Sequence, residues 1–469
     1  MSNSNYFDHK LYSLFQSLTG VEKRELHHFL ASPFFNRRAE VRRLWEYLSA
    51  QKDEKNEAWQ KTKIHEHLFP GEPYDDPRLR YTLTFLREKI EWFLAFRQWD
   101  RQAAAPKLAL ATAYRERRLE KHFRHAVQLL GNEVDSMSYG LARRDLAFRL
   151  ELEKHTFSEL RQRSGESTLQ AVHDAFDLYV LSGKLRFACL MAAHQAVVRV
   201  EYDYSFLTWI VRWLEGNKLL AEPEIGMYYH CYKALTENSE EHFRAFRQVL
   251  ESQGAKFDAA ELKDILMLAV NFCIRQLNAG SSQYVQEAFD LYRWGLERDM
   301  LTEQGVLSRF TYKNIVALGL GLKQFEWVER FLHEWRPAVE ERYRESSFYY
   351  NLAKLWFAKK DYRQAMPLLA RVGDADFLMT LDAKVLLLKM YVESGEWEAL
   401  ESLIASFRSF LRRKTSLGYH KEHYLSLLGY TRRLLVLNRH DRAAVQALRD
   451  QIAGDTAVLE REWLLGQMP

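Results

Sequence analysis

Histidines and carboxylates occur in four short stretches that could contribute ligands to a metal ion. Two imidazoles that lie close together on one element can reach the same ion. A tetrahedral zinc site needs three or four ligands, and a di-iron bundle needs two Glu-x-x-His motifs with two further glutamates. No stretch has such a complement, so we predict no metal site and no cofactor. The stretches are Glu25/His28, His65/His67, His122/His125 and His420/His423.

The motifs of common enzyme classes are absent from the sequence. No segment matches the phosphate-binding loop GxxxxGK[ST], the nucleophile elbow GxSxG or the zinc motif HExxH. Gly319 and Gly321 form a GxG that follows a helical pattern, and we assign it to a helix turn. Asp374 and Asp376 form a DxD that we assign to helix capping. We predict a protein without catalytic activity, and an enzyme whose site combines scattered residues stays an alternative.

A basic tract near the C-terminus could bind nucleic acid. Residues 408–449 carry 10 basic and 2 acidic side chains, a net charge of +8, whereas the whole chain carries +4. Aromatic residues alternate with these cations, and cations with stacking rings are what single-stranded nucleic acid binding uses. A solvated or partner-facing surface explains the same pattern. The residues proposed for a nucleic-acid surface are Arg412, Arg413, Lys414, Arg432 and Arg433.

The composition predicts a folded protein that does not span a membrane. Of the 469 residues, 47% are hydrophobic and 14% aromatic, which is enough to build a core. No apolar run approaches the roughly 18–20 residues that cross a bilayer, and the first ten residues lack the pattern of a secretory signal. The 3 cysteines include no close pair, which favours reduced thiols. We therefore predict a cytoplasmic protein.

Proline divides the chain into two parts. Of 9 prolines, 4 precede residue 78, and only Pro223, Pro337 and Pro367 lie between Pro106 and Pro469. Because proline interrupts helices, long helical tracts are expected after residue 106. Alternating β-branched runs are nearly absent. We predict an all-α protein with a small N-terminal helical domain, residues 1–103, followed by a helical array, residues 104–469.

Three helix starts are predicted in the N-terminal domain. Thr19 and Glu22 have the spacing of a capping box. Asn36 is suited to cap the following helix. Asp76 and Pro77 suit the N-cap and first-turn positions of a long helix that reaches roughly Trp99.

A three-residue pattern recurs along residues 104–469. An apolar residue is followed by apolar residues at +3 and +7, which lie on the same helical face. Successive copies start 46, 35, 39, 41, 41, 37 and 35 residues apart, and the cysteines Cys189, Cys231 and Cys273 are spaced by 42 and 42. Such a period predicts an α-solenoid of about eight or nine helical hairpins, with each cysteine in a buried slot. The copies start at Phe123, Leu169, Tyr204, Phe243, Tyr284, Phe325, Tyr362 and Trp397, and only Glu287 breaks the pattern, where the neighbouring Ala288 could take its position.

The repeat is most regular over about residues 345–405. An aromatic residue, a leucine, a small residue and a second aromatic occur in order, followed by the start of a second helix, at Tyr349, Leu352, Ala353, Trp356, Tyr362 and Ala365. This stretch resembles the tetratricopeptide-repeat family. The resemblance implies a right-handed superhelix whose concave groove binds peptides or partner helices. The groove positions of the family fall on Lys313, Tyr350, Lys354, Phe357 and Lys389.

The resemblance and the missing catalytic motifs together predict a binding function. We expect a non-catalytic cytoplasmic scaffold, adaptor or regulator that holds a protein or peptide partner in the groove. The three groove lysines would favour an acidic peptide, whereas an ordinary solvated face explains the same residues. No small-molecule substrate is indicated. The alternative is a nucleic-acid-associated regulator that uses the surface of residues 408–449.

Overall fold

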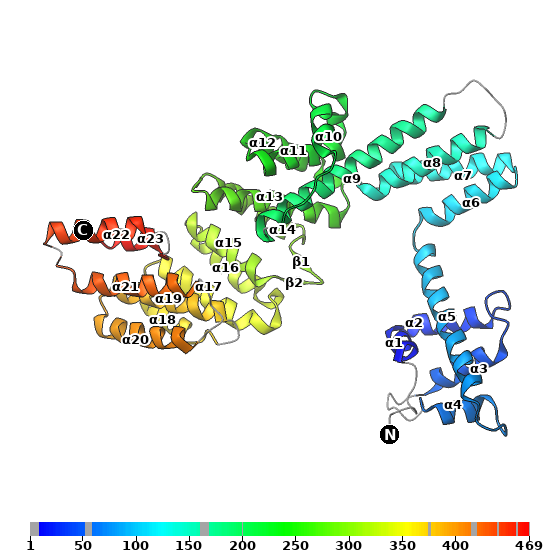
Figure 1. Ribbon diagram of the computed structural model, residues 1–469, viewed down its shortest axis with the longest axis horizontal. Helices are drawn as coiled ribbons and strands as arrows, with labels where there is room; N and C mark the ends of the chain where they lie inside the picture. The colour runs from blue at the N-terminus through cyan, green and yellow to red at the C-terminus, as the bar shows by residue number, and fades with distance from the viewer. Residues whose placement is uncertain are drawn as a thin grey trace. The chain divides into compact units, whose positions relative to one another are not determined.

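The computed structural model describes residues 9–51, 59–159, 168–198, 200–373, 377–413, 420–438, 440–455 and 458–468. Most of these residues lie in helices, which confirms the predicted all-α class (Figure 1). Strands within the described ranges are limited to an antiparallel pair, β1 (Thr302–Glu303) and β2 (Val306–Leu307). None of the described helices combines the length and the apolar character needed to cross a bilayer.

The chain divides into two compact units, Met1–Val180 and Leu181–Pro469. This division differs from the predicted one at residue 103, because the helices that follow residue 103 belong to the first unit as far as Val180. One hydrophobic core nevertheless closes between Leu11 and Phe93, inside the predicted N-terminal domain. A second core, between Ala111 and Leu150, lies in the same unit. A domain of residues 1–103 therefore stays a prediction.

Short helices surround one long helix in the first unit. The long helix, α5, contacts α1, α2, α3 and α4. Its contact stripe consists of Leu79, Leu83, Leu86, Ile90 and Phe93, which are buried and recur every three or four residues. Each such side chain contributes about 1.5–3 kcal/mol by leaving water. The helices are α1 (His9–Ser17), α2 (Gly20–Ala31), α3 (Ala39–Ala50), α4 (Lys61–Leu68), α5 (Asp76–Asp100), α6 (Ala104–Glu116), α7 (Glu120–Ser136) and α8 (Leu141–Glu159), with α9 (Thr168–Val198) continuing into the second unit.

The predicted helix starts of the first unit are partly correct. The Glu22 amide donates to Thr19 Oγ1 over 3.2 Å, and the Thr19 amide donates to Glu22 Oε2 over 2.9 Å, which confirms the capping box of α2. The cap assigned to Asn36 is wrong, because α3 starts after Arg38 and has no side-chain cap. The Asn36 amide instead bonds the carbonyls of Leu30 and Arg38 across the turn.

The helices of the second unit contact one another in consecutive pairs. The pairs are α11 with α12, α13 with α14, α15 with α16, α17 with α18 and α19 with α20. The second helix of a pair also contacts the first helix of the next pair, as α14 contacts α15 and α16 contacts α17. The elements are α10 (Leu207–Leu214), η1 (Lys218–Ala221), α11 (Pro223–Glu237), α12 (Glu240–Gln253), η2 (Gly254–Lys256), α13 (Ala259–Asn278), α14 (Tyr284–Glu297), α15 (Arg309–Gly321), α16 (Phe325–Trp335), η3 (Arg336–Ala338), η4 (Glu341–Tyr343), α17 (Arg344–Ala358), α18 (Tyr362–Leu369), α19 (Phe377–Ser394), α20 (Trp397–Arg413), α21 (His420–Val436), α22 (Arg442–Gly454) and α23 (Arg461–Gly466).

The recurring pattern marks the contact face of the second helix in most pairs. Phe243, Phe246 and Leu250 of α12 are all buried. In α14, Ala288 is buried whereas Glu287 is half-buried, so Ala288 occupies the contact position. The pattern therefore follows real packing wherever a pair of short helices forms.

The copy of the pattern that starts at Leu169 does not mark a contact face. Leu169 and Phe176 are 61% and 45% exposed. The reason is that α9 is one continuous helix of 31 residues instead of a short second helix. The buried positions of α9 lie further along, at Leu181 and Leu185. In the last copy, the leading residue Trp397 is also half exposed, although the residues at +3 and +7 are buried.

The three cysteines are buried in α9, α11 and α13, as their equal spacing predicts. The Cys189 thiol donates to the carbonyl of Tyr228 over 3.2 Å. Burial raises the pKa of Cys189, and it raises the pKa of Cys273 to about 12. Neutral buried thiols act as small apolar side chains, so the cysteines fill the close contacts between neighbouring helices.

Gly319 allows three helices to approach closely. A Cβ atom on Gly319 of α15 would lie 2.5 Å from Val328 Cγ2 of α16 and 3.2 Å from Phe289 Cε2 of α14. Gly321 lies in the same helix, and its nearest neighbour would be 3.7 Å away, at Val285 Cγ1. The GxG is therefore part of a helix, as predicted, and only its first glycine is required by packing.

We expect Gly319→Ala to lower the free energy of unfolding by about 1–3 kcal/mol, because the new methyl group overpacks a stiff β-branched neighbour. Gly321→Ala is the matched control, and it should be neutral or stabilising by up to about 1 kcal/mol through helix propensity. Urea denaturation of both variants measures the difference. Equal stabilities would contradict the close approach at Gly319.

Candidate functional site

The five predicted groove residues lie together on one side of α15, α17 and α19. Tyr350, Lys354 and Phe357 share a face of α17, because they are four and three residues apart. Lys313 Nζ, from α15, lies 5.8 Å from the centre of the Tyr350 ring. Lys389 Nζ, from α19, lies 5.6 Å from the centre of the Phe357 ring. The structure thus gathers these residues into one lysine cluster, and their binding of a partner stays a prediction.

Two carboxylates neutralise the outer lysines of this cluster. Lys313 forms an ion pair with Asp382 of α19. Lys389 Nζ lies 2.9 Å from Glu460 Oε2, in the turn before α23. Sequence reasoning missed both carboxylates. Asp382 precedes Lys389 by two helical turns, a spacing that could have placed it on the same face, whereas no local signal links Lys389 to Glu460.

Lys354 lies between these two ion pairs and has no carboxylate of its own. It makes no hydrogen bond or ion pair with any residue that the structure describes, and its Nζ lies 5.9 Å from the centre of the Tyr350 ring. Burial and the neighbouring charge of Lys313 lower the pKa of Lys354 to about 8, although Asp382 and Glu460 oppose this shift. The cluster can therefore accept one more negative charge.

Aromatic rings pack against the side chains of the lysine cluster. Tyr350 is only 6% exposed, and burial, followed by the charges of Asp382 and Glu460, raises its pKa. Burial and then Asp382 raise the pKa of Tyr424, from α21, to about 12. Both phenols are neutral near pH 7, so the rings present apolar and weakly polar surface beside the lysines.

A second polar group, centred on Glu393 of α19, adjoins the lysine cluster. Glu393 accepts hydrogen bonds from Lys360, from Tyr362 and from the indole of Trp463, whose Nε1 lies 2.8 Å from Glu393 Oε1. Burial alone would raise the pKa of Glu393, but the hydrogen bonds from Lys360, Tyr362 and Trp463 lower it. Tyr362 is the first residue of a predicted contact face. Its side chain is half-buried, and its hydroxyl donates to Glu393.

We expect Lys354→Met to raise the free energy of unfolding at pH 7 by about 1–3 kcal/mol, because a charged lysine is held there without a counter-ion. The pKa of Lys354 is lower in the folded chain, so between pH 8 and about 10.4 the unfolded chain binds the extra proton. Wild-type stability should therefore rise towards that of the variant as the pH increases through this range.

Urea denaturation of both proteins at pH 7 and pH 9.5 tests this expectation. Lys218→Met is the matched control, because Lys218 is exposed in η1 and the described residues offer it no partner. If the free energies of unfolding of wild type and Lys354→Met differ by the same amount at both pH values, the pKa of Lys354 is that of an ordinary lysine.

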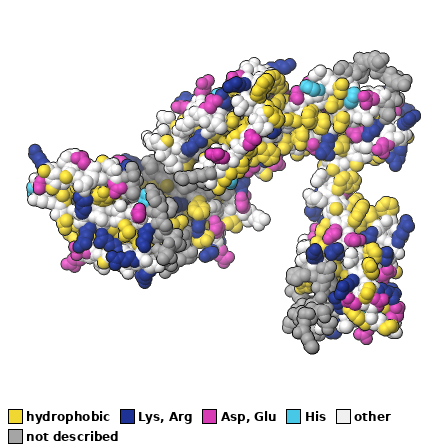
Figure 2. Space-filling view, viewed as in Figure 1, with side chains coloured by type: hydrophobic (Ala, Val, Ile, Leu, Met, Phe, Trp, Pro, Cys, Tyr) yellow, Lys and Arg dark blue, Asp and Glu magenta, His cyan; other side chains and the backbone are white. Residues whose placement is uncertain are grey.

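The arginines of the basic tract are exposed but lie in two separate pairs. Arg412 and Arg413 are the last two residues of α20. Arg432 and Arg433 lie on α21, and Arg432 is about 18 Å along that helix from its first residue, His420. Lys414 lies outside the described residues. Figure 2 shows Lys and Arg side chains gathered at the lower left, on the α20 side of the second unit. The interleaved rings Phe410, Tyr424 and Tyr430 pack against the C-terminal core, so nucleic-acid binding stays an unsupported alternative.

The histidine stretches have structural contacts. His65 is buried, and its Nε2 accepts the Asp75 amide over 3.1 Å. The His122 ring lies 5.3 Å from the Tyr114 ring, and the side chain of His420 lies outside the described residues. Among the residues that are described, no three His, Cys, Asp or Glu side chains are arranged to hold a metal ion.

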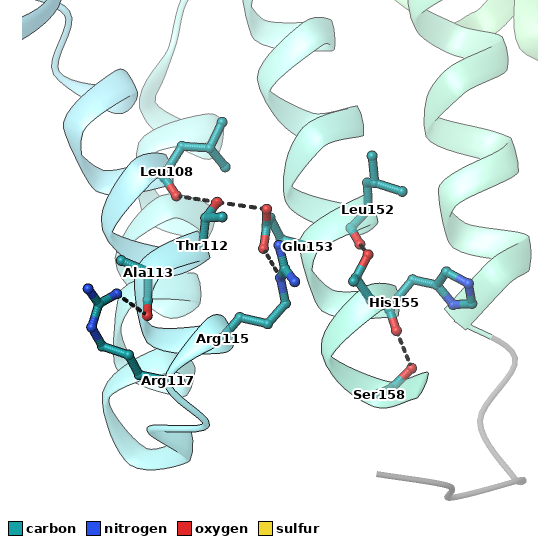
Figure 3. Close-up of polar contacts among 10 residues, drawn as sticks. Leu108, Thr112, Ala113, Arg115, Arg117, Leu152, Glu153, His155 and Ser158 are labelled. Carbon is teal, nitrogen blue, oxygen red and sulfur yellow. Dashed lines mark hydrogen bonds and ion pairs between the residues drawn. The ribbon is translucent and has the colours of Figure 1, made fainter. Parts of the chain in front are cut away.

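Another polar group, in the first unit, joins two helices (Figure 3). Glu153 of α8 accepts hydrogen bonds from Thr112 Oγ1 and from Arg115 Nε of α6, each over 2.7 Å. The hydrogen bond that Arg115 donates to Glu153 raises the pKa of Arg115, although burial opposes the shift. Both carboxylate oxygens are occupied, so this group stabilises the packing of α6 on α8 and leaves no atom directed at a ligand.

Comparison with known proteins identifies no relative of this chain. No protein-family model matches it, and neither the curated proteins nor the solved structures contain a match. The residues of the lysine cluster and of the helix pairs are therefore the basis for a functional proposal.

Proposed function

We propose that this protein is a non-catalytic scaffold or adaptor that binds an acidic segment of a partner protein. The binding surface is the lysine cluster on α15, α17 and α19, and the helix pairs of the second unit form a tetratricopeptide-like array that presents it. The free thiols Cys189, Cys231 and Cys273 suit a reducing compartment such as the cytoplasm.

The stacking of helix pairs supports this array. The second helices α14, α16 and α18 contact the first helix of the next pair, and first helices also contact one another, as α15 contacts α17 and α17 contacts α19. First helices that stack in this way place equivalent faces side by side. Lys313, Lys354 and Lys389 lie on three successive first helices. A partner segment that runs along these helices would meet all three lysines.

The single observation that carries the proposal is the missing counter-ion of Lys354. Two of the three lysines have a carboxylate, whereas Lys354 has none among the described residues and has a lowered pKa. A partner carboxylate beside Lys354 would restore the ordinary preference for the charged form. Charge-assisted hydrogen bonds of this kind contribute about 1.5–3 kcal/mol each. Tyr350 and Phe357 would add apolar contact to the same segment.

We expect Lys354→Glu combined with Lys389→Glu to abolish partner binding, because the surface would then repel an acidic segment. The measurement is recovery of bound proteins from nuclease-treated native lysate on immobilised full-length chain, quantified by mass spectrometry. Lys218→Glu is the control for a charge reversal at an exposed lysine outside the cluster, and circular dichroism melting establishes that each variant is folded.

Proteins that wild type and Lys218→Glu retain, and the double variant loses, support the proposal. Equal recovery by all three chains would exclude the lysine cluster as the binding surface. Proteins that disappear from the wild-type sample on nuclease treatment would instead favour the nucleic-acid alternative.

A further inference from the structure

We propose that the chain's own segment Val458–Met468 is an intramolecular ligand of the lysine cluster, which the partner must displace. This inference rests on the proposed function and specifies the regulation and the partner chemistry of the same site. The segment contains the turn before α23 and α23 itself. Its contacts with α19 are polar, and they reach the lysine cluster and the neighbouring Glu393.

The polar side of the segment makes two charged contacts with α19. Glu460 Oε2 lies 2.9 Å from Lys389 Nζ, and Trp463 Nε1 lies 2.8 Å from Glu393 Oε1. The Trp463 ring also lies 5.5 Å from Lys389 Nζ, within the range of a cation–π interaction. A carboxylate and an indole three residues apart therefore bind one face of α19 together.

The backbone at Glu460 indicates that this contact is held in place by its surroundings. Glu460 has φ 56 and ψ 37, the left-handed conformation that residues other than glycine seldom adopt. Such a conformation is unfavourable by itself and persists where neighbouring contacts fix it. The apolar residues Val458, Leu464 and Met468 supply that fixation, since all three are buried in the C-terminal core.

The segment covers only part of the cluster. Glu460 pairs with Lys389, whereas Lys354 stays without a carboxylate. The 38% exposure of the Glu460 side chain makes its ion pair weak enough to exchange. A partner that offers one carboxylate to Lys389 and another to Lys354 would bind more tightly than the chain's own segment. The partner chemistry is therefore an acidic helical turn with an aromatic N–H donor.

The test uses a fluorescein-labelled peptide with the sequence of residues 458–468 and the full-length chain. Fluorescence anisotropy measures its binding to wild type and to a variant that combines Glu460→Gln with Trp463→Phe. The variant keeps Leu464, an isosteric side chain at 460 and an aromatic ring at 463, so the apolar contacts of Val458, Leu464 and Met468 remain. Glu462→Gln is the matched control, because Glu462 is exposed on the same helix without a partner among the described residues.

We expect the combined variant to bind the peptide at least about tenfold more tightly than wild type, because its own segment no longer bonds Lys389 and Glu393 and so competes less for these two side chains. The Glu462→Gln chain should bind like wild type. A peptide with glutamine at its first glutamate should bind neither chain. Equal affinities for wild type and the combined variant, or no binding to either, would overturn the proposal.

A second measurement covers the case in which the combined variant melts at a lower temperature. Glu460→Gln alone retains the Trp463 contact, and it should still bind the peptide about threefold more tightly than wild type. The lysate experiment separates this inference from the proposed function. Partner recovery that depends on Lys354, together with equal peptide affinities, would leave the proposed function standing and reject only the internal ligand.

Discussion

An amphipathic helix pair cannot bury its apolar surface by itself, and the second unit depends on this constraint. Each pair covers one face internally and needs the next pair to cover the other. The contacts of α14 with α15 and of α16 with α17 satisfy that need. Close approach is possible because small residues lie at the crossings, as Gly319 does beside Val328 and Phe289. The position of every surface residue in the array follows from this stacking.

Stacking also creates the electrostatic problem at the lysine cluster. Because α17 contacts both α15 and α19, the lysines Lys313, Lys354 and Lys389 are brought together although like charges repel. Asp382 relieves the repulsion at Lys313 and Glu460 relieves it at Lys389. At Lys354, burial and then the charge of Lys313 lower the pKa to about 8. The cluster is thus incompletely neutralised by the chain itself, and this property gives it affinity for a further anion.

Local signals in the sequence were sufficient for the helices and for one face of the site. The capping box of Thr19 and Glu22 could be read from spacing, because both partners lie within one turn. The same spacing rule fails at Asn36, whose amide bonds the turn instead of the helix end. It also fails at Leu169, because helical periodicity does not distinguish a short helix from part of a long one. The five predicted groove residues could be placed together because the tetratricopeptide resemblance assigned them to the same side of successive helices.

The missing parts of the site depend on contacts between distant segments. Glu460 reaches Lys389 across 71 positions, and Trp463 reaches Glu393 across 70. No sequence period or motif predicts either contact, because both form only when the segment that contains α23 folds back on α19. His230 and His242 were missed for a related reason, as their 3.0 Å contact joins two different helices.

The three buried thiols have a consequence for following the motions of this protein. Cys189, Cys231 and Cys273 report on α9, α11 and α13, and all three are buried in the folded chain. A thiol reagent can reach each sulfur only when its helix opens, so the rate of alkylation measures local unfolding. Peptide mapping of the alkylated sites would then resolve the order in which neighbouring pairs separate. The native cysteines can therefore serve as built-in probes of the rate at which each of these helices opens.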